Sequence, residues 1–329
     1  MKVLNCFINI KNPETKTSVS FNYVNEIEIV TSTRNFTDTA KVIVPRKLKY
    51  KGKSITDYVK RNSTISISLG YGTDFYFETV FKGYVKTVSS GTPTVIECEN
   101  EAWKLKQVKL PATYYPKLKI GDFVKEWMPS YNTSIAEVDL GEVKITRDTT
   151  LAKVFEYFMT NYPVNFYFRD DKFYGILPTT LTTEDNATRT IKFRIGENTI
   201  SDNLVYTLAE DLNLQIIVKT ITRDNKKLEW KEPQDVQDAE IRTFLVPGKE
   251  TVEQLKAFAK DQLAKFKVDK MAGDFMAFGE PYVRKGDIVH ILDDDNKERH
   301  DKKFFVDAVT YTFGQGGYRQ KITLGGQIK

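Results

Sequence analysis

The stretch that decides the fold is RNSTISISLGYGTDFYFETVFKGYVKTVSSG at residues 61–91, together with its counterpart RKGDIVHILDDDNKERHDKKFFVDAVTYTFG at residues 284–314. Both have the same order of pieces: a basic turn, a strand, a polar loop, a long aromatic strand and a glycine turn. Aligned without a gap, they are identical at Arg61 and Arg284, Ile65 and Ile288, Leu69 and Leu292, Phe81 and Phe304, Thr87 and Thr310, and Gly91 and Gly314. The repeat predicts two related β units.

Residues 1–105 surround the first copy and alternate apolar and polar residues in short runs. β-branched and aromatic residues at the apolar positions are typical of half-buried antiparallel strands. Glycines at the turns separate the runs, and no long helical pattern intervenes. The runs are VLNCFINI, VSFNYVNEIEIV, AKVIV, TISISLGYG, FYFETVFKGYVKTV and TVIECE. This region is predicted to be a small antiparallel β-barrel domain.

Residues 106–200 follow with a different pattern, and we expect a smaller α+β domain with two helices and a hairpin. The first helix is expected behind a cap at Asp122 and ends before Pro129. The second carries an apolar stripe at helical spacing. Its residues are Leu151, Val154, Phe155 and Phe158. VNFYFR and KFYGIL, joined by Asp170-Asp171, predict the hairpin.

Residues 201–329 return to the strand pattern and contain the second copy of the repeat. One helix is expected within this region, near residues 251–268, where Thr251 and Gln254 are spaced as a capping box. The overall prediction is a mainly β fold in which two related small antiparallel β-barrel domains are separated by a smaller α+β domain.

Composition and charge indicate no particular partner. The 329 residues carry 49 Lys and Arg against 44 Asp and Glu, a net charge of +5 that is too small to specify a nucleic-acid or membrane surface. No window reaches the roughly 18 apolar residues of a membrane helix. The start of the chain lacks the features of a secretory signal. Cys6 and Cys98 form no spacing motif, so we expect reduced, buried thiols in a protein made in the cytosol.

Motifs that could support catalysis do not assemble into a site. Gly52-Lys53-Ser54 lacks the first glycine of a phosphate-binding loop and is interpreted as a turn. Asp293-Asp294-Asp295 with Glu298 fails the calcium-loop spacing and is interpreted as a solvated loop. The two histidines, His290 and His300, are expected to be one packed and one exposed. We therefore predict no enzyme, no catalytic residue, no metal and no cofactor.

Two basic runs with interleaved aromatic residues, residues 47–53 and 104–119, leave a second function open. Barrels with lysine-rich loops and aromatic faces bind single-stranded nucleic acid. Glu97, Glu99 and Glu101 lie beside the second run, which favours solubilising loops or charge that faces a subunit. A single-stranded nucleic-acid-binding β-barrel protein is the alternative.

The ordered set of segments resembles a known family, the baseplate hub proteins of contractile phage tails. This late-control-protein family is also similar to the tube-forming part of type VI secretion spike proteins. The resemblance rests on FTDTAKVIVPRK, ISISLGYG, FKGYVKTVSSGTPTVIECENEAWKLKQ and AFGEPYVRKGDIVHILDDDNKERHDKKFFVDAVTYTFGQGGYRQKITLGG. It is strongest over residues 36–107 and 272–325.

The resemblance implies a structural role in a phage or prophage particle. Members form a homotrimer whose six barrels adapt the sixfold tail tube to the threefold spike and line the central channel. The implied partners are the tail tube protein, the spike protein and other baseplate and tape-measure proteins, with DNA as passing cargo and no membrane insertion. The implied location is the tail baseplate of the virion, after assembly in the host cytoplasm. No spike or wall-cutting domain follows the second β unit, so both are expected on separate polypeptides.

The resemblance also assigns roles to individual residues. Backbone or packing roles fall to Gly83, Trp103, Gly286, Asp287, Gly314, Gly317 and Tyr318. Glycine is expected where a turn needs positive φ, and Trp103 is expected to plug the end of the first barrel. The strands FKGYVKTV and FFVDAVTYTF are candidates for pairing between barrels of adjacent subunits. The candidate interface residues are Phe81, Tyr84, Val85, Phe304, Val306 and Val309.

Overall fold

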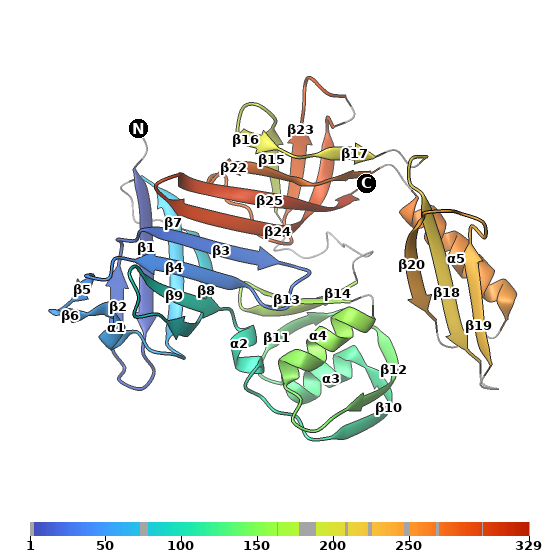
Figure 1. Cartoon of the computed structure of the whole chain (residues 1–329), viewed down its shortest axis with the longest axis horizontal. Coiled ribbons are helices and arrows are strands. Elements are labelled where there is room, and N and C mark those ends of the chain that lie inside the picture. Colours follow the sequence, from blue (N-terminus) through green and yellow to red (C-terminus); the bar gives the residue numbers. More distant parts are fainter. Residues whose placement is uncertain are drawn as a thin grey trace. The chain divides into compact units, whose positions relative to one another are not determined.

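The structure, a computed structural model, is mainly β, with 52% of the described residues in strands and 14% in helices, which confirms the predicted mainly β class. It describes residues 3–72, 78–162, 164–177, 189–207, 210–222, 226–246, 251–267, 270–297 and 299–328, so Glu298 of the acidic loop lies outside the described residues. The chain divides into two compact units (Figure 1). Residues 1–203 with 273–329 form the main unit, and residues 204–272 form an inserted module.

The N-terminal half of the main unit is an antiparallel sheet with the spatial order β3-β4-β9-β8-β7-β1-β2. Its strands are β1 (Leu4–Lys11), β2 (Ser18–Phe21), β3 (Glu26–Ser32), β4 (Thr39–Val44), β7 (Thr64–Tyr71), β8 (Glu78–Val88) and β9 (Thr94–Glu99). A small hairpin of β5 (Lys49–Tyr50) and β6 (Lys53–Ser54) leads into α1 (Ile55–Tyr58). Gly52 forms the turn of this hairpin with a φ of 82°, which confirms the turn interpretation of Gly52-Lys53-Ser54.

The C-terminal half of the main unit continues the same sheet. Its strands are β15 (Thr190–Arg194), β16 (Thr199–Asp202), β22 (Asp274–Phe278), β23 (Ile288–Leu292), β24 (Lys302–Gly314) and β25 (Gly317–Ile328). β15 and β16 come from the end of the region assigned by sequence to the α+β domain, yet β15 pairs in parallel with β23 and β16 pairs with β22. The side chain of Phe193 on β15 is fully buried there, in edge-to-face contact with Phe275 of β22.

The two halves share one topology. In chain order, β3, β4, β7, β8 and β9 of the first half correspond to β16, β22, β23, β24 and β25 of the second. In space, the orders β3-β4-β9-β8-β7 and β16-β22-β25-β24-β23 also correspond, and every neighbouring pair in both runs is antiparallel. The sequence repeat at residues 61–91 and 284–314 therefore has a structural counterpart.

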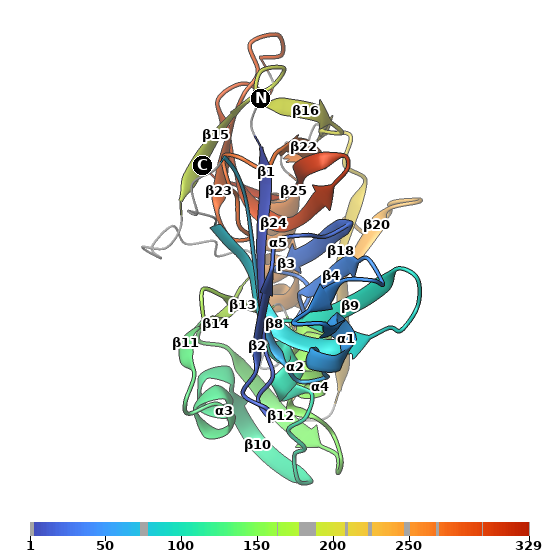
Figure 2. The ribbon, with the colours of Figure 1, turned by 90° about the vertical axis from the view of Figure 1, so that its left-hand side faces the viewer.

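Between the halves, residues 102–176 form the middle α+β region (Figure 2). Its elements are α2 (Ala102–Leu105), β10 (Thr113–Lys119), α3 (Ile120–Trp127), β11 (Asn132–Ile135), β12 (Asp139–Ile145), α4 (Leu151–Asn161), β13 (Asn165–Arg169) and β14 (Lys172–Ile176). The predicted α4 stripe and the β13–β14 hairpin are present. The predicted cap at Asp122 is wrong, because α3 begins at Ile120 and places Asp122 in its first turn.

The described part of the inserted module contains a three-stranded sheet, a two-stranded antiparallel pair of β17 and β21, and one helix. Its elements are β17 (Val205–Thr207), β18 (Leu214–Ile221), β19 (Lys227–Glu232), β20 (Glu240–Leu245), α5 (Val252–Phe266) and β21 (Lys270–Ala272). β18 lies between β19 and β20, and α5 covers one face of this sheet (Figure 1). The hydroxyl of Thr251 accepts a hydrogen bond from the backbone N–H of Gln254 at 3.3 Å, so α5 begins where the sequence predicts a cap.

Candidate functional site

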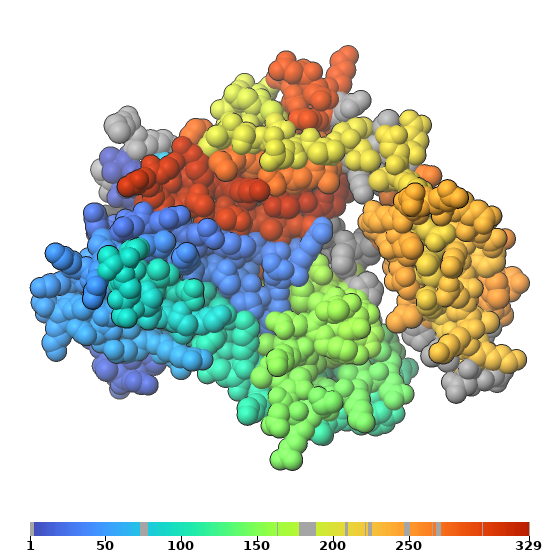
Figure 3. Space-filling view, in the orientation of Figure 1, coloured from blue at the N-terminus to red at the C-terminus, as the bar shows by residue number. Residues whose placement is uncertain are grey.

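The two halves of the main unit meet along a seam between β3 and β24. Seven consecutive residues of each strand lie opposite one another, from Ser32 and Ala308 to Glu26 and Gly314. The hydroxyl of Thr31 adds a hydrogen bond to the carbonyl oxygen of Val309 at 3.1 Å. Figure 3 shows the N-terminal strands in blue meeting the C-terminal strands in red along this line. The seam makes one continuous sheet from two halves of the same strand order.

A six-residue loop between β3 and β4, residues 33–38, ties the seam together, and we call it the junction loop. Arg34 forms an ion pair with Asp307 of β24. Asp38 forms a second ion pair, with both carboxylate oxygens 2.6 Å from the ammonium of Lys285. Both of these side chains are almost inaccessible to solvent, at 7% and 5% exposure. Each pair joins the N-terminal half to the C-terminal half.

The surroundings of Lys285 explain why a charged pair is tolerated inside the protein. Its ammonium also donates to the carbonyl oxygen of Ser32 at 3.2 Å and lies 5.2 Å from the ring centroid of Tyr167. Asp38 in turn accepts bonds from the backbone N–H of Ser32 at 3.0 Å and the amide of Asn100 at 2.9 Å. Burial lowers the pKa of Lys285, and the neighbouring Asp38 carboxylate opposes this shift. The pair is nearly inaccessible to solvent and fully hydrogen-bonded, so breaking it leaves a buried charge.

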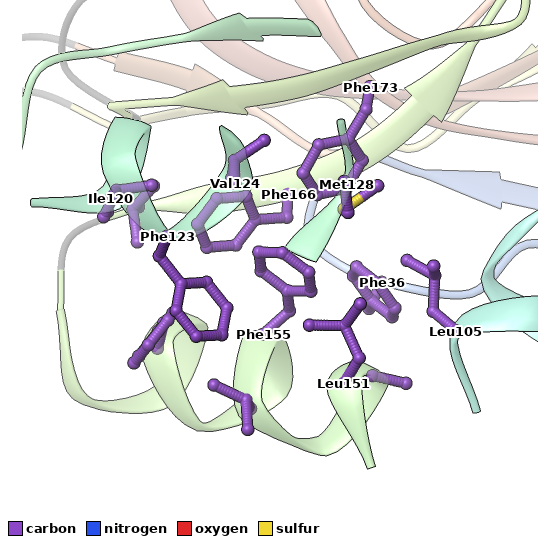
Figure 4. Packing of buried hydrophobic residues seen from close by; sticks show 14 of the residues in the cluster. Phe36, Leu105, Ile120, Phe123, Val124, Met128, Leu151, Phe155, Phe166 and Phe173 are labelled. Atoms are coloured by element: carbon purple, nitrogen blue, oxygen red, sulfur yellow. The ribbon is translucent and has the colours of Figure 1, made fainter. Parts of the chain in front are cut away.

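The junction loop also reaches the middle region through Phe36. This side chain leaves the N-terminal half and enters the aromatic core between α3, α4 and the β13–β14 hairpin (Figure 4). Its ring stacks on Phe155 at a centroid distance of 5.6 Å and meets Phe173 edge-on at 6.3 Å. One short loop therefore contacts all three parts of the main unit.

The turn between β13 and β14 makes the return contact from the middle region. Asp170 and Asp171 both have positive φ in this turn. Asp171 pairs with Lys82 of β8 at 2.7 Å, and Asp170 pairs with Arg284 of the C-terminal half. The middle region is thus held to both halves by charge as well as by apolar packing.

A cavity of about 540 Å³ lies where the three parts meet. Its walls include Lys82 of β8, the Asp170–Asp171 turn, and Asp38 with Lys285. These charged groups are joined in the pairs described above, which link the three parts of the main unit to one another. Within the described ranges, no three His, Cys, Asp or Glu side chains are grouped closely enough to hold a metal ion.

The residues assigned backbone roles by sequence lie where these parts meet or at the ends of the seam. A Cβ on Gly83 would overlap the carbonyl oxygen of Glu99, and one on Gly286, whose φ is 81°, would overlap the Arg169 guanidinium. Gly317 has a φ of 94°, and Gly314 lies against the backbone of Asn25. These four positions leave no room for a side chain or need a conformation that favours glycine.

The other three of these residues are buried. Asp287 is inaccessible to solvent and forms ion pairs with Arg189 at 3.0 Å and Arg284 at 3.4 Å. The indole N–H of Trp103 donates to the side chain of Asn62 at 2.9 Å, at the end of the N-terminal half. Tyr318 is 1% exposed, and its carbonyl oxygen accepts a bond from the hydroxyl of Tyr71 at 2.7 Å across the two halves.

The candidate interface residues lie mostly in the interior of this chain. Phe81, Val85, Phe304, Val306 and Val309 are all buried, whereas Tyr84 is half-buried and donates to Glu101 at 2.9 Å. One edge of β24 pairs with β25, and the other is shared by β23 and β3. A subunit contact at β8 or β24 would therefore use neighbouring backbone rather than these buried side chains.

The junction loop and its partners were not predicted from the sequence. Phe36 and Asp38 lie in the FTDTAKVIVPRK segment that carried part of the resemblance, but nothing in their spacing singled them out. Lys285 stands opposite Asn62 when the repeats are aligned, but many other aligned positions also carry a charge in only one copy, so this difference did not mark Lys285 either.

The cysteines, the histidines and the acidic loop that the sequence singled out lie outside the junction loop. Cys6 and Cys98 are both buried free thiols, as expected. His290 is mostly buried and pairs with Asp301 at 2.6 Å, while the side chain of His300 is 43% exposed. Asp294 and Asp295 are exposed, as the solvated-loop interpretation expects, but Asp293 is only 6% exposed and accepts bonds from the backbone N–H groups of Asp295 and Asn296, so for this residue the interpretation is wrong. No helix in the described ranges is long and apolar enough to cross a membrane.

Solved structures with the same fold include tail proteins and a chain of a PdpA-VgrG complex. The tail protein from Neisseria meningitidis MC58 matches with a TM-score of 0.64 at 12% identity, over 98% of this chain and 96% of that one. The 43 kDa tail protein of prophage MuSo2 from Shewanella oneidensis matches with a TM-score of 0.62 at 10% identity, over 98% of each chain. A chain of the lidded Francisella PdpA-VgrG complex matches with a TM-score of 0.56 at 9% identity, over 99% of this chain and 53% of that one.

These likenesses are structural. No protein-family profile and no curated protein matches the sequence. The fold is that of phage tail proteins and of VgrG-containing complexes, at identities where only the fold is shared.

Proposed function

We propose that this chain is a structural subunit of the baseplate hub of a contractile phage or prophage tail. In this role it would act through shape and rigidity rather than catalysis. The fold it shares with tail proteins of Neisseria and Shewanella supports the tail assignment. The observation that carries the proposal is the pair of five-stranded units with equal topology, joined side by side in one sheet.

Three copies of such a chain would place six equivalent units in a ring. The ring would then present nearly sixfold symmetry to a tail tube while keeping true threefold symmetry for a spike. Its centre would be a channel for DNA, and other baseplate proteins would bind its outside. Because thrust would pass through such a ring, the contact between its units must be rigid. The buried ion pair of Lys285 and Asp38 would help to hold the two halves of each chain in a fixed position.

The in-chain seam suggests how one copy would join the next. β16 occupies in the second half the place that β3 has in the first, and among the described strands it pairs only with β22. β8 occupies the place of β24, and its last residues, Thr87 and Val88, pair with β9 alone. We propose that β16 of one copy pairs with the end of β8 in the next, and so repeats the β3–β24 contact between chains.

The alternative, binding of single-stranded nucleic acid, needs free positive charge on the basic runs. Glu99 binds Lys86 at 2.8 Å and Lys106 at 2.6 Å, and Glu101 binds Lys104 at 2.7 Å. These contacts neutralise the start of the second run and favour a structural role for it.

The test is the mass of the purified chain in solution, alone and with the spike protein encoded beside it, followed by negative-stain microscopy. A trimer in either sample that appears as a ring supports the proposal. A monomer that ignores the spike and binds single-stranded DNA at low salt would overturn it in favour of the alternative.

A further inference from the structure

The core of the inserted module is incompletely covered at both edges of its three-stranded sheet. Five apolar side chains between sheet and helix are buried: Leu214, Ile216, Val218, Leu255 and Ala259. Leu228 and Trp230 of β19 are only partly buried, as are Phe244 of β20 and Val246 just after it, with Phe258 and Phe266 of α5. An added strand beside β20 would cover the side chains at that edge.

The two edges of this sheet differ in their protection against added strands. The β19 edge, KLEWKE, alternates charges, and Glu229 pairs with Lys219 at 3.0 Å and with Lys231 at 3.7 Å. Charged residues of this kind normally keep an edge strand from pairing further. β20 carries one charged pair, Arg242 with Glu240 at 2.8 Å, whereas its outer face exposes Ile241 at 59% and Leu245 at 72%. The outer face of β20 is therefore uncharged, whereas that of β19 is charged.

The backbone of β20 is also oriented for pairing. The N–H of Glu240 donates to the carbonyl oxygen of Asn213, just before β18, at 2.8 Å, and the N–H of Val246 donates to that of Lys219 in β18 at 2.9 Å. In a strand the N–H groups alternate in direction, so those of Ile241, Thr243 and Leu245 point away from β18. Within the described part of the chain, no other strand pairs with β20.

We infer that β20 binds a second copy of this chain, strand to strand and antiparallel, about a two-fold axis through Thr243. This register sets the exposed Ile241 of one copy opposite the exposed Leu245 of the other. It sets Arg242 opposite Phe244, a favourable cation–aromatic pair, and no like charges face each other. The strand is thus complementary to itself, which is what a symmetric two-fold contact requires.

This contact goes beyond the proposed ring and does not depend on it. A threefold ring contains no two-fold axis, so the contact would join free chains or chains of two different rings. A single strand pair buries little surface, so the association is expected to be weak and best detected by trapping.

The trap is a cysteine at the axis, Thr243→Cys in the full chain. Directly opposite residues that exchange hydrogen bonds in an antiparallel pair have Cα atoms about 5.5 Å apart, within the range of roughly 4.4–6.8 Å that a disulfide spans. The two native cysteines are buried and give little background. Under mild oxidation we expect this variant to shift from monomer to disulfide-linked dimer on a non-reducing gel.

The matched control is Lys231→Cys, which places an exposed thiol on the same outer face but at the protected edge. Adding Leu245→Glu to Thr243→Cys should abolish the dimer, because the carboxylate would face Ile241. Equal dimer from Thr243→Cys and Lys231→Cys, or a dimer insensitive to Leu245→Glu, would overturn the inference. The mass measurement for the ring is made on the reduced wild-type chain, so the two proposals fail separately.

Discussion

At the scale of single residues, the ion pair of Lys285 and Asp38 is the most consequential contact in the main unit. Its ammonium and carboxylate lie 2.6 Å apart and are nearly inaccessible to solvent. A buried pair of this kind contributes little net stability over an apolar pair of the same size, because desolvation opposes the attraction. Its effect is on specificity: each charge can be satisfied only when the two halves meet in this register.

Removing one member should therefore cost far more than the pair contributes. Lys285→Ala leaves the Asp38 carboxylate buried without its cation, and we expect a loss of about 3–5 kcal/mol in the free energy of unfolding. Lys82→Ala is the control, because the Lys82–Asp171 distance of 2.7 Å is close to that of the buried pair but the side chains are exposed, at 59% and 74%. It should cost no more than about 1 kcal/mol. Urea denaturation compares the two, and equal losses would contradict this account.

Gly83 provides a second test at this scale. A methyl group at Gly83 would overlap the backbone of Glu99, so Gly83→Ala must push β8 and β9 apart. We expect a loss of about 1–3 kcal/mol in the free energy of unfolding. Gly121→Ala is the matched control, because the space around Gly121 in α3 is open, and alanine there should stabilise by up to about 1 kcal/mol. A thermal melt that ranks the two variants in the opposite order would refute this account.

Individual residues were predictable from sequence only where the local backbone demands one residue type. Gly83 and Gly286 belong to that class, because close approach or positive φ excludes other side chains. Asp38 and Lys285 do not, because their roles depend on a partner almost 250 positions away in the chain, which no local pattern encodes. Their burial follows from assembly of the seam rather than from the strands themselves.

At the scale of elements, the junction loop fixes the middle region to the sheet. Phe36 enters a core whose other aromatic rings all come from the middle region, including Phe155, Phe168 and Phe173. Without that ring, the middle region would still be joined to the rest of the main unit through α2 and through the ion pairs of the Asp170–Asp171 turn. The loop is therefore expected to set how firmly the middle region is held.

Phe36→Ala should lower the free energy of unfolding by about 3–5 kcal/mol, as truncation of a buried phenylalanine does. The loss should be local, with faster amide hydrogen exchange in α4 and in the β13–β14 hairpin than in the β3–β24 seam. Tyr157→Ala, which removes a 52% exposed ring from α4 itself, is the control and should leave both regions protected. Uniform loss of protection in Phe36→Ala would mean that the middle region and the seam unfold as one unit.

Helices and strands whose apolar residues recur at regular spacing were predictable from the sequence. The pairing of strands that are distant in the chain was not. α4 and α5 follow their apolar stripes and Thr caps, and β7, β8, β23 and β24 follow the repeat. The parallel pairing of β15 with β23 and the direct joining of β3 to β24 were outside the prediction. The spacing of apolar residues along a strand shows which of its faces is buried, but it does not show which other strand pairs with its edge.

At the scale of the whole molecule, the main unit contains within one chain the edge contact that the proposed ring would repeat between chains. Within the chain, β3 and β24 already join two equal five-stranded units edge to edge. β16 of the C-terminal half corresponds to β3, and β8 of the N-terminal half corresponds to β24. In the proposed ring, β16 and the end of β8 would pair with neighbouring copies. Repetition of an edge contact around a closed ring removes free edges, which otherwise invite aggregation.

Ile200→Lys tests this use of β16. Ile200 lies on the edge strand with 42% exposure, and a lysine there should hinder strand addition without entering the core. We expect ring formation to weaken at least about tenfold, which corresponds to roughly 1.4 kcal/mol per contact. Phe7→Lys is the matched control, because Phe7 is also 42% exposed but lies on β1, which the proposed contact leaves free.

Light scattering over a dilution series, with the spike protein present where the ring needs it, measures both variants against the wild-type chain. Unchanged thermal stability in both would show that only assembly is affected. If Phe7→Lys weakens the ring and Ile200→Lys does not, copies meet through β1, and the repeat within the chain is not the template for contacts between chains. If both variants assemble normally, neither edge is the contact, and the ring must close through surfaces outside the sheet.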